Sequence, residues 1–160
     1  MTQGKDQDEH SEDTDAQLLA RVDDADEYTR AQAAVALARC GHPQGLAACL
    51  KTIADAAEPT HAYSTPAGWQ LIAMGTSALP GVLDVLESED SPKRLCADFV
   101  FRQISQRQFG FDGRQWHAPG YEVWASWWLG IGYHYDGPAT EREAAVQRAR
   151  AACADWIDGH

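Results

Sequence analysis

The stretch DEYTRAQAAVALARCG, residues 26–41, decides the fold class of this 160-residue chain. Alanine is the strongest helix former, and Gly41 supplies the left-handed residue on which a helix commonly ends. The apolar residues recur at intervals of three and four, which places them on one face of a helix: Ala33, Ala36, Leu37 and Cys40. The stretch therefore predicts an amphipathic helix from about Glu27 to Cys40.

The same helical periodicity continues along the rest of the chain. Alanine occurs 27 times, mostly in stretches of helical period, and β-branched residues are sparse. Capping-box spacing at Thr14 and Gln17 predicts a short first helix, and the same spacing at Thr140 and Glu143 predicts a last one. We therefore predict an all-α chain, with further helices at about residues 43–54, 65–75, 76–87, 91–107 and 140–157.

The helical segments also repeat along the chain at two offsets. At an offset of 34, residues match in three pairs: Ala33 with Ala67, Leu37 with Leu71, and Gly41 with Gly75. At an offset of 64 they match in four pairs: Asp26 with Asp90, Arg30 with Arg94, Ala33 with Ala97, and Leu37 with Phe101. A period of roughly 30 to 35 residues is typical of an α-solenoid, in which each helical hairpin buries its apolar face by stacking on its neighbours.

The repeats predict a short α-solenoid of about three helical hairpins, with a short N-terminal helix and a C-terminal capping helix. The hairpins fall at about residues 26–55, 64–88 and 91–131, and the capping helix falls at about 140–157. Together they form one expected domain, residues 16–160.

These residues resemble HEAT repeats of the short bacterial kind over about residues 26–131. The resemblance is carried by the Asp-x3-Arg-x2-Ala-x3-Leu pattern of 26–37, by Gly75-x2-Ala-Leu-Pro80, and by a tail in which Phe-Gly-x-Asp precedes Trp116 and Trp124–Trp128. It implies HEAT-like hairpins and the interaction functions that such repeats serve as scaffolds, adaptors and inhibitors. It also implies a structural role between repeats for four residues: Asp26, Arg30, Asp90 and Arg94.

The charge of the chain is concentrated at its front end. The formal net charge is −11, and residues 1–27 hold ten acidic and two basic side chains, a net charge of −8. Residues 1–15 are expected to form a disordered acidic arm. An acidic chain repels phosphate backbones, so we expect no nucleic-acid partner and instead a protein partner, with a basic surface as one possibility.

No segment resembles a targeting or membrane sequence. Residues 1–15 hold no apolar run of a secretory signal, and no later stretch approaches the roughly 18 to 20 apolar residues of a membrane span. The four cysteines form no CxxC pair and lie among helix-forming residues, where cysteine is usually a small buried side chain. We expect a cytoplasmic monomer with no membrane contact and with reduced, buried thiols.

Aromatic residues are densest between Trp116 and Tyr135. Trp124, Trp127 and Trp128 share one helix face, which either seals the last hairpin against the C-terminal helix or presents a pocket or partner surface. Trp124 and Trp128 are expected to be buried, and Trp116, Tyr133 or Tyr135 to lie nearer solvent.

A basic segment, residues 93–114, comes just before the aromatic one. Arg94, Asp98 and Arg102 are spaced by four and predict a charged ladder on a helix surface. Taking the basic and aromatic segments together, the candidate partner or ligand surface comprises Trp116, His117, Tyr121, Tyr133, Tyr135, Arg107 and Arg114.

No catalytic, metal or cofactor motif occurs in the sequence. The chain lacks HExxH, GxSxG, a phosphate-binding GxxxxGK[ST] loop and GxGxxG, so no catalytic residue, metal or cofactor is predicted. The expected function is a non-catalytic protein–protein interaction module, a scaffold, adaptor or immunity-type inhibitor that binds its partner on the solenoid surface. The alternatives are a small-ligand-binding or sensor domain built on the Trp- and Tyr-rich insertion and, through the family resemblance, a HEAT-like DNA glycosylase or a bilin-lyase-type enzyme.

Overall fold

The computed structural model describes residues 14–111 and 119–159, and the regular structure in these two stretches is helical. The β-type pairing seen there is one isolated bridge between Glu58 and His61. The prediction of an all-α chain is therefore confirmed for the described residues. In chain order the helices are α1 (Asp15–Arg21), α2 (Glu27–Arg39), α3 (Gly45–Lys51), α4 (Pro66–Met74), the 3₁₀ helix η1 (Gly75–Ala78), α5 (Leu79–Leu86), α6 (Ser91–Gln108), α7 (Tyr121–Ile131), α8 (Ala139–Ala152) and α9 (Ala154–Asp158).

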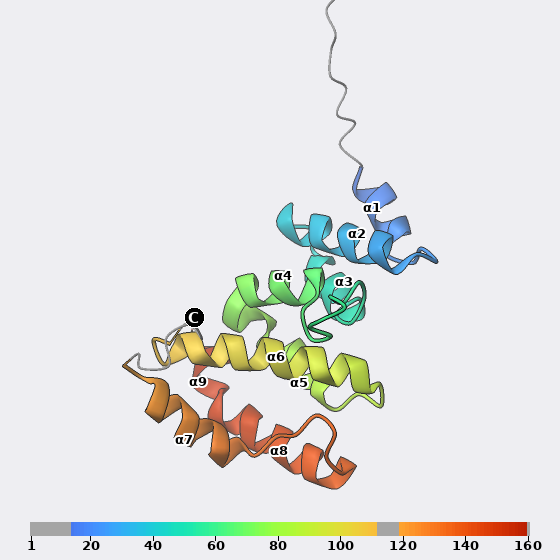
Figure 1. Cartoon of the computed structure of the whole chain (residues 1–160). Helices are drawn as coiled ribbons and strands as arrows, with labels where there is room; N and C mark the ends of the chain where they lie inside the picture. The colour runs from blue at the N-terminus through green and yellow to red at the C-terminus, as the bar shows by residue number, and fades with distance from the viewer. Residues whose placement is uncertain (1–13, 112–118, 160) are drawn as a thin grey trace, which may run out of the picture.

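The helices follow one another in chain order from one end of the molecule to the other, with α1 and α2 at one end and α7, α8 and α9 at the other (Figure 1). The longest described helix, α6, packs along α5 and lies between α4 on one side and α7 on the other. The hairpin expected at residues 64–88 corresponds to α4 and α5. These helices pack mainly on other elements, α4 on α2, α3 and α6, and α5 on α3, α6 and α8.

The starts of α2 and α6 share one construction, which we call the capping clasp. Asp26 accepts a hydrogen bond from the Thr29 amide at 2.7 Å, and Asp90 accepts one from the Lys93 amide at 3.2 Å. The arginine four residues after each aspartate donates to the two carbonyls that precede the cap: Arg30 to Asp24 and Ala25, and Arg94 to Ser88 and Glu89. The sequence match at an offset of 64 thus corresponds to a shared local geometry.

Each arginine of the two clasps also reaches a distant segment. Arg30 donates to both carboxylate oxygens of Asp55, at 2.7 and 3.0 Å, and so ties α2 to the turn after α3. Arg94 donates from Nε to the Tyr135 carbonyl at 2.7 Å and ties α6 to the segment after α7. These are structural contacts, while the stacking between repeats that the family resemblance implies stays a prediction.

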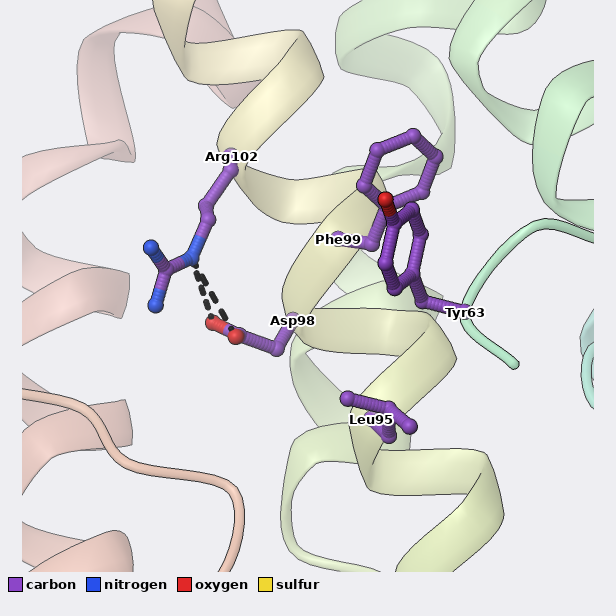
Figure 2. A pocket seen from close by; sticks show the side chains of 5 residues that line it. All are labelled: Tyr63, Leu95, Asp98, Phe99 and Arg102. Atoms are coloured by element: carbon purple, nitrogen blue, oxygen red, sulfur yellow. Dashed lines mark hydrogen bonds and ion pairs between the residues drawn. The ribbon is translucent and has the colours of Figure 1, made fainter. Parts of the chain in front are cut away.

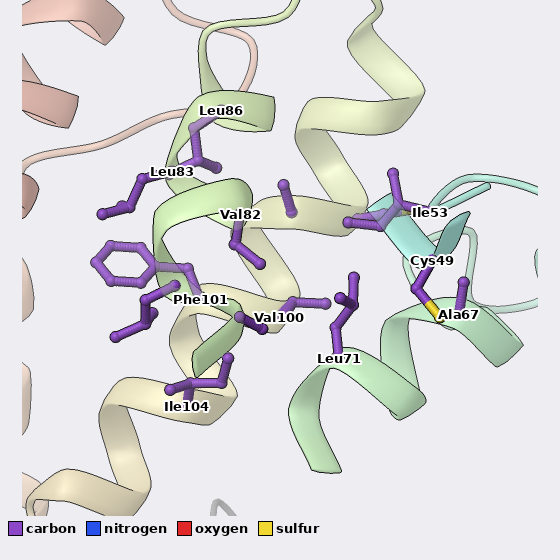
Figure 3. Close-up of a cluster of buried hydrophobic side chains, with 14 of the residues drawn as sticks. Cys49, Ile53, Ala67, Leu71, Val82, Leu83, Leu86, Val100, Phe101 and Ile104 are labelled. Carbon is purple, nitrogen blue, oxygen red and sulfur yellow. The ribbon is translucent and has the colours of Figure 1, made fainter. Parts of the chain in front are cut away.

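The core is one continuous cluster of buried apolar side chains that reaches from Leu18 to Cys153. Between α3, α4, α5 and α6 it includes Leu71, Val82 and Phe101, all fully buried (Figure 3). Burying a side chain of this size contributes roughly 1.5 to 3 kcal/mol. The side chains that α6 adds to the core form one stripe, which we call the core stripe: Cys96, Ala97, Val100, Phe101 and Ile104.

One run, Pro66–Leu86, has the length and mean hydropathy of a membrane-spanning helix, although the sequence analysis found no such stretch. In the structure Gly75, with φ of 67°, interrupts the run and separates α4 from η1 and α5. Its large apolar side chains, such as Leu71 and Leu83, are buried in the core. Core helices pass the same test on length and composition, so burial accounts for the hydropathy of this run.

The N-terminal helix starts as predicted. Thr14 and Gln17 form a capping box, in which the Gln17 amide donates to Thr14 Oγ1 and the Thr14 amide donates to Gln17 Oε1. Residues 1–13, the greater part of the expected acidic arm, lie outside the described residues.

The predicted ends of two other helices are wrong. The helix expected at 43–54 is the shorter α3, because the chain turns after Lys51 and brings Asp55 to Arg30. The capping box expected at Thr140 does not form, because α8 begins after Pro138 and Thr140 already lies inside the helix. The capping helix expected at 140–157 is divided at Cys153 into α8 and α9.

Three of the four cysteines are buried as expected, and the fourth, Cys40, is exposed. It is the C-cap residue of α2, and the chain beyond it turns through Gly41 with φ of 75°. A residue at a helix end has one turn of neighbours instead of two, so its side chain is less enclosed than its helical period predicts.

Candidate functional site

A second stripe of side chains runs along α6 beside the core stripe. Its members recur at intervals of three and four and line two adjacent pockets, both of which include Arg102. We call this the groove stripe, and the two pockets together the α6 groove. The groove stripe consists of Leu95, Asp98, Phe99, Arg102, Gln103 and Gln106.

The first pocket of the α6 groove lies between α6 and the segment before α4 and has a volume of about 230 Å³. Its aromatic wall is the ring pair of Tyr63 and Phe99, whose centroids are 4.7 Å apart (Figure 2). Trp69 meets Phe99 edge-on at 5.4 Å and donates its ring N–H to Ser64 Oγ. Trp69 is held by these contacts and is still 49% exposed, so it extends the apolar wall toward solvent.

Arg102 joins the two pockets. Its Nε donates to both carboxylate oxygens of the buried Asp98 at 3.2 Å, and its guanidinium lies 4.6 Å from the centre of the Trp128 ring. Burial raises the pKa of Asp98, and the charge of Arg102 offsets that rise only in part. The two terminal nitrogens of Arg102 point away from Asp98 (Figure 2) and donate no hydrogen bond within the described residues. They remain available as donors in the groove.

The second pocket lies between α6 and α7 and has a volume of about 420 Å³. This is within the range of small-molecule pockets, roughly 300 to 1,000 Å³. Leu129 forms part of the lining with 80% of its surface exposed. The lining is mostly aromatic and comprises Arg102, Gln103 and Gln106 from α6, Phe111, and Tyr121, Trp124, Ala125, Trp128 and Leu129 from α7.

Trp124 fixes one wall of the second pocket. Its ring N–H donates to the buried Ser105 Oγ at 3.0 Å, which holds α7 against α6. Its ring stacks on Trp128 with centroids 5.8 Å apart, and Phe111 packs against Tyr121 at 5.3 Å. Because a hydrogen bond and ring contacts set these positions, the pocket is formed before any ligand arrives.

Gln106 carries the one polar atom of the groove that has no partner. The residue is only 8% exposed, and its Oε1 is buried and accepts no hydrogen bond from the described residues. Buried side-chain oxygens are nearly always bonded, and leaving one unbonded costs about 1 to 3 kcal/mol. Gln106 lines the second pocket, so a donor placed in that pocket would satisfy this oxygen.

The structure brings few of the predicted surface residues together. Tyr121 lines the second pocket, whereas Arg107 is exposed, donates to the Ile72 carbonyl at 2.9 Å and lines neither pocket. Tyr135 is half-buried and packs against the core near the Arg94 clasp. Three of the predicted residues lie outside the described residues: Arg114, Trp116 and His117.

The expectation for Tyr133 is wrong. We expected it near solvent, but it is 1% exposed and donates its hydroxyl to the Leu86 carbonyl at 2.8 Å. That carbonyl belongs to the last residue of α5 and has no intrahelical partner, which is why a tyrosine is buried there. The burial of Trp124 is confirmed. The burial of Trp128 is confirmed only in part, because its ring also lines the second pocket.

The ladder on α6 is also corrected. Arg94 and Asp98 are buried, so they do not form the expected surface ladder, and only the Asp98–Arg102 pair is made. The sequence analysis did not identify Gln103, Gln106, Leu129 and Tyr63 as site residues. The interval of three and four among residues 95–106 marks the groove stripe, but apolar and charged residues alternate within it, which hid it from a search for apolar faces.

The described residues hold no group of three or more His, Cys, Asp or Glu side chains placed to bind a metal ion. Comparison with protein-family models, with curated proteins and with solved structures gives no match for this chain. The resemblance to HEAT repeats therefore stays a prediction, and the site is argued from its own geometry.

Proposed function

We propose that this chain is a non-catalytic interaction module of the HEAT-like helical-repeat class, which binds a polypeptide segment of a partner protein in the α6 groove. The repeat class is supported by the capping clasp, which recurs 64 residues apart at the starts of α2 and α6. It is also supported by the stacking of helices in chain order. A solenoid of about three hairpins is the finer form of this proposal.

The observation that carries the proposal is the composition and continuity of the groove. The two pockets meet at Arg102, so a bound segment has a continuous path along one face of α6. Tryptophan, tyrosine and arginine dominate binding energy at protein interfaces, and all three line this path. Exposed apolar side chains border it at both ends, with Trp69 beside the first pocket and Leu129 in the second. Such side chains gain stability when a partner covers them.

The charge of the chain bears on the partner. A net charge of −11 attracts basic chains over several ångströms and raises the rate of their association, and salt screens this effect. We therefore propose a partner segment that carries basic residues beside its apolar anchors, with binding that weakens as ionic strength rises.

A displayed library of random dodecapeptides tests this proposal. Peptides are selected on the full chain and counter-selected on Leu129→Asp, which places a charge on an 80% exposed position and should leave the fold intact. Tyr28→Asp is the matched control, because Tyr28 is 62% exposed on α2, far from the groove. Selected peptides should lose about tenfold in affinity for Leu129→Asp, the loss of one interface anchor, and keep their affinity for Tyr28→Asp. The proposal fails if no peptide is enriched or if both variants bind as the parent does.

A further inference from the structure

We infer that the second pocket of the α6 groove is the anchor site for an aromatic side chain that carries a hydrogen-bond donor, a tryptophan or a tyrosine of the partner segment. This inference rests on the proposed function, because it names the residue by which the partner is recognised. It follows from the unpaired Gln106 oxygen, the aromatic walls and the charge balance at Arg102.

Gln106 requires the donor. Its Oε1 is buried, lines the pocket and accepts no hydrogen bond from the described residues. The oxygen accepts from an N–H or O–H group and gains nothing from a purely apolar ligand. An indole N–H or a phenol O–H supplies this donor at the edge of a flat ring, so the ring can contact the walls while its edge bonds Gln106.

The walls require the ring. Trp124 and Trp128 stack with an interplanar angle of 27°, and Phe111 and Tyr121 lie edge-to-face at 66°, so the pocket offers both ring faces and ring edges. Aromatic rings prefer offset-stacked and edge-to-face partners. A volume of about 420 Å³ accommodates a two-ring side chain together with neighbouring atoms of the segment that carries it.

The charges around the pocket disfavour ionic anchors. An acidic side chain meets one cation, Arg102, whose charge Asp98 already balances at 3.2 Å, and it brings acceptor oxygens against the acceptor of Gln106. A lysine finds aromatic faces, but Arg102 already occupies the face of Trp128 at 4.6 Å and repels a second cation. A neutral ring with a donor makes every contact without either conflict.

The test compares two probes that differ by one donor. Indole and 1-methylindole have nearly the same shape, and only indole has an N–H. Each is titrated into the ¹⁵N-labelled full chain, and binding is followed by the shifts of the Trp124 and Trp128 ring N–H and the Gln106 side-chain amide signals. Indole should bind about tenfold more tightly, the value of one hydrogen bond to a buried acceptor.

The variant Gln106→Leu shows whether Gln106 is the cause. Leucine has a similar size and removes the unpaired oxygen, so the variant should fold, and it should bind the two probes equally. Gln103→Leu is the matched control in the same pocket and should keep the preference for indole. Equal binding of the probes by the parent chain, a preference that survives Gln106→Leu, or no shift of these signals would each overturn the inference.

The peptides selected for the proposed function separate the two proposals. If they hold tryptophan or tyrosine at a fixed position and lose their advantage on Gln106→Leu, both stand. If they bind the groove without such an anchor, the inference fails and the proposed function stands. If indole binds with the expected preference and no peptide is enriched, the pocket accepts a free aromatic compound and the proposed function fails.

Discussion

Replacing Tyr133 by phenylalanine tests the contact that joins the C-terminal helices to α5. The Tyr133 ring is 1% exposed, and its hydroxyl donates to the Leu86 carbonyl at 2.8 Å. The phenylalanine ring fills the same space, so the change removes the hydrogen bond and leaves a buried carbonyl without a donor. An average hydrogen bond contributes about 1 kcal/mol, and an unsatisfied buried group raises the loss to as much as about 3 kcal/mol. We expect the free energy of unfolding to fall by about 2 kcal/mol.

Urea unfolding followed by circular dichroism measures this loss. The midpoint should fall while the slope stays unchanged, because both proteins expose the same surface. In a chain of this size a loss of 1 kcal/mol lowers the melting temperature by roughly 2 to 4 °C, so Tyr133→Phe should melt about 4 to 8 °C lower. The control is Tyr135→Phe, whose half-buried hydroxyl makes no hydrogen bond within the described residues and whose loss should stay within about 0.5 kcal/mol.

The pH dependence gives a second reading of the same contact. Burial raises the pKa of Tyr133 above its ordinary value of about 10. The folded protein then keeps a proton that the unfolded chain gives up, so the parent loses stability as pH rises through 10, and Tyr133→Phe does not suffer this loss. The difference in unfolding free energy between the two should therefore narrow above pH 10. Equal stability of Tyr133→Phe and Tyr135→Phe at neutral pH would refute the reasoning.

Three further changes test the core, the thiols and the groove. Phe101→Ala should lower the free energy of unfolding by about 3 to 5 kcal/mol in the same urea assay, because it opens a cavity under α6; a loss below 1 kcal/mol would contradict its burial. Iodoacetamide should modify Cys40 in the folded protein and leave the other thiols, whose pKa values burial raises to about 11 or 12, until the chain unfolds; mass spectrometry should count one adduct and then four. The raised pKa of Asp98 means that the folded state binds more protons above pH 4, so stability should fall as pH rises through that pKa, and Asp98→Asn should flatten this part of the curve. An unchanged slope would place the effect elsewhere.

Sequence reasoning succeeded where contacts are local. The period of 3.6 predicts the buried face of α2, and the capping box at Thr14 depends on residues three apart, so both can be seen without the rest of the chain. Tyr133 lies in the segment after α7, where no period applies, and its burial depends on a carbonyl 47 residues away. Burial of Asp98 likewise depends on α6 being covered by distant helices. The groove was missed because it requires knowing which side of α6 those helices leave open.

The two stripes of α6 have a consequence for how this chain can change over evolutionary time. The core stripe and the groove stripe share no residue, so most substitutions in the groove stripe alter what the surface recognises and leave the packing beneath it intact. Asp98 and Gln106 are exceptions, since both are buried and any replacement there is felt by the fold as well. Exposed positions such as Leu129 are free to drift toward new partners, while these two set the chemistry that every partner must meet.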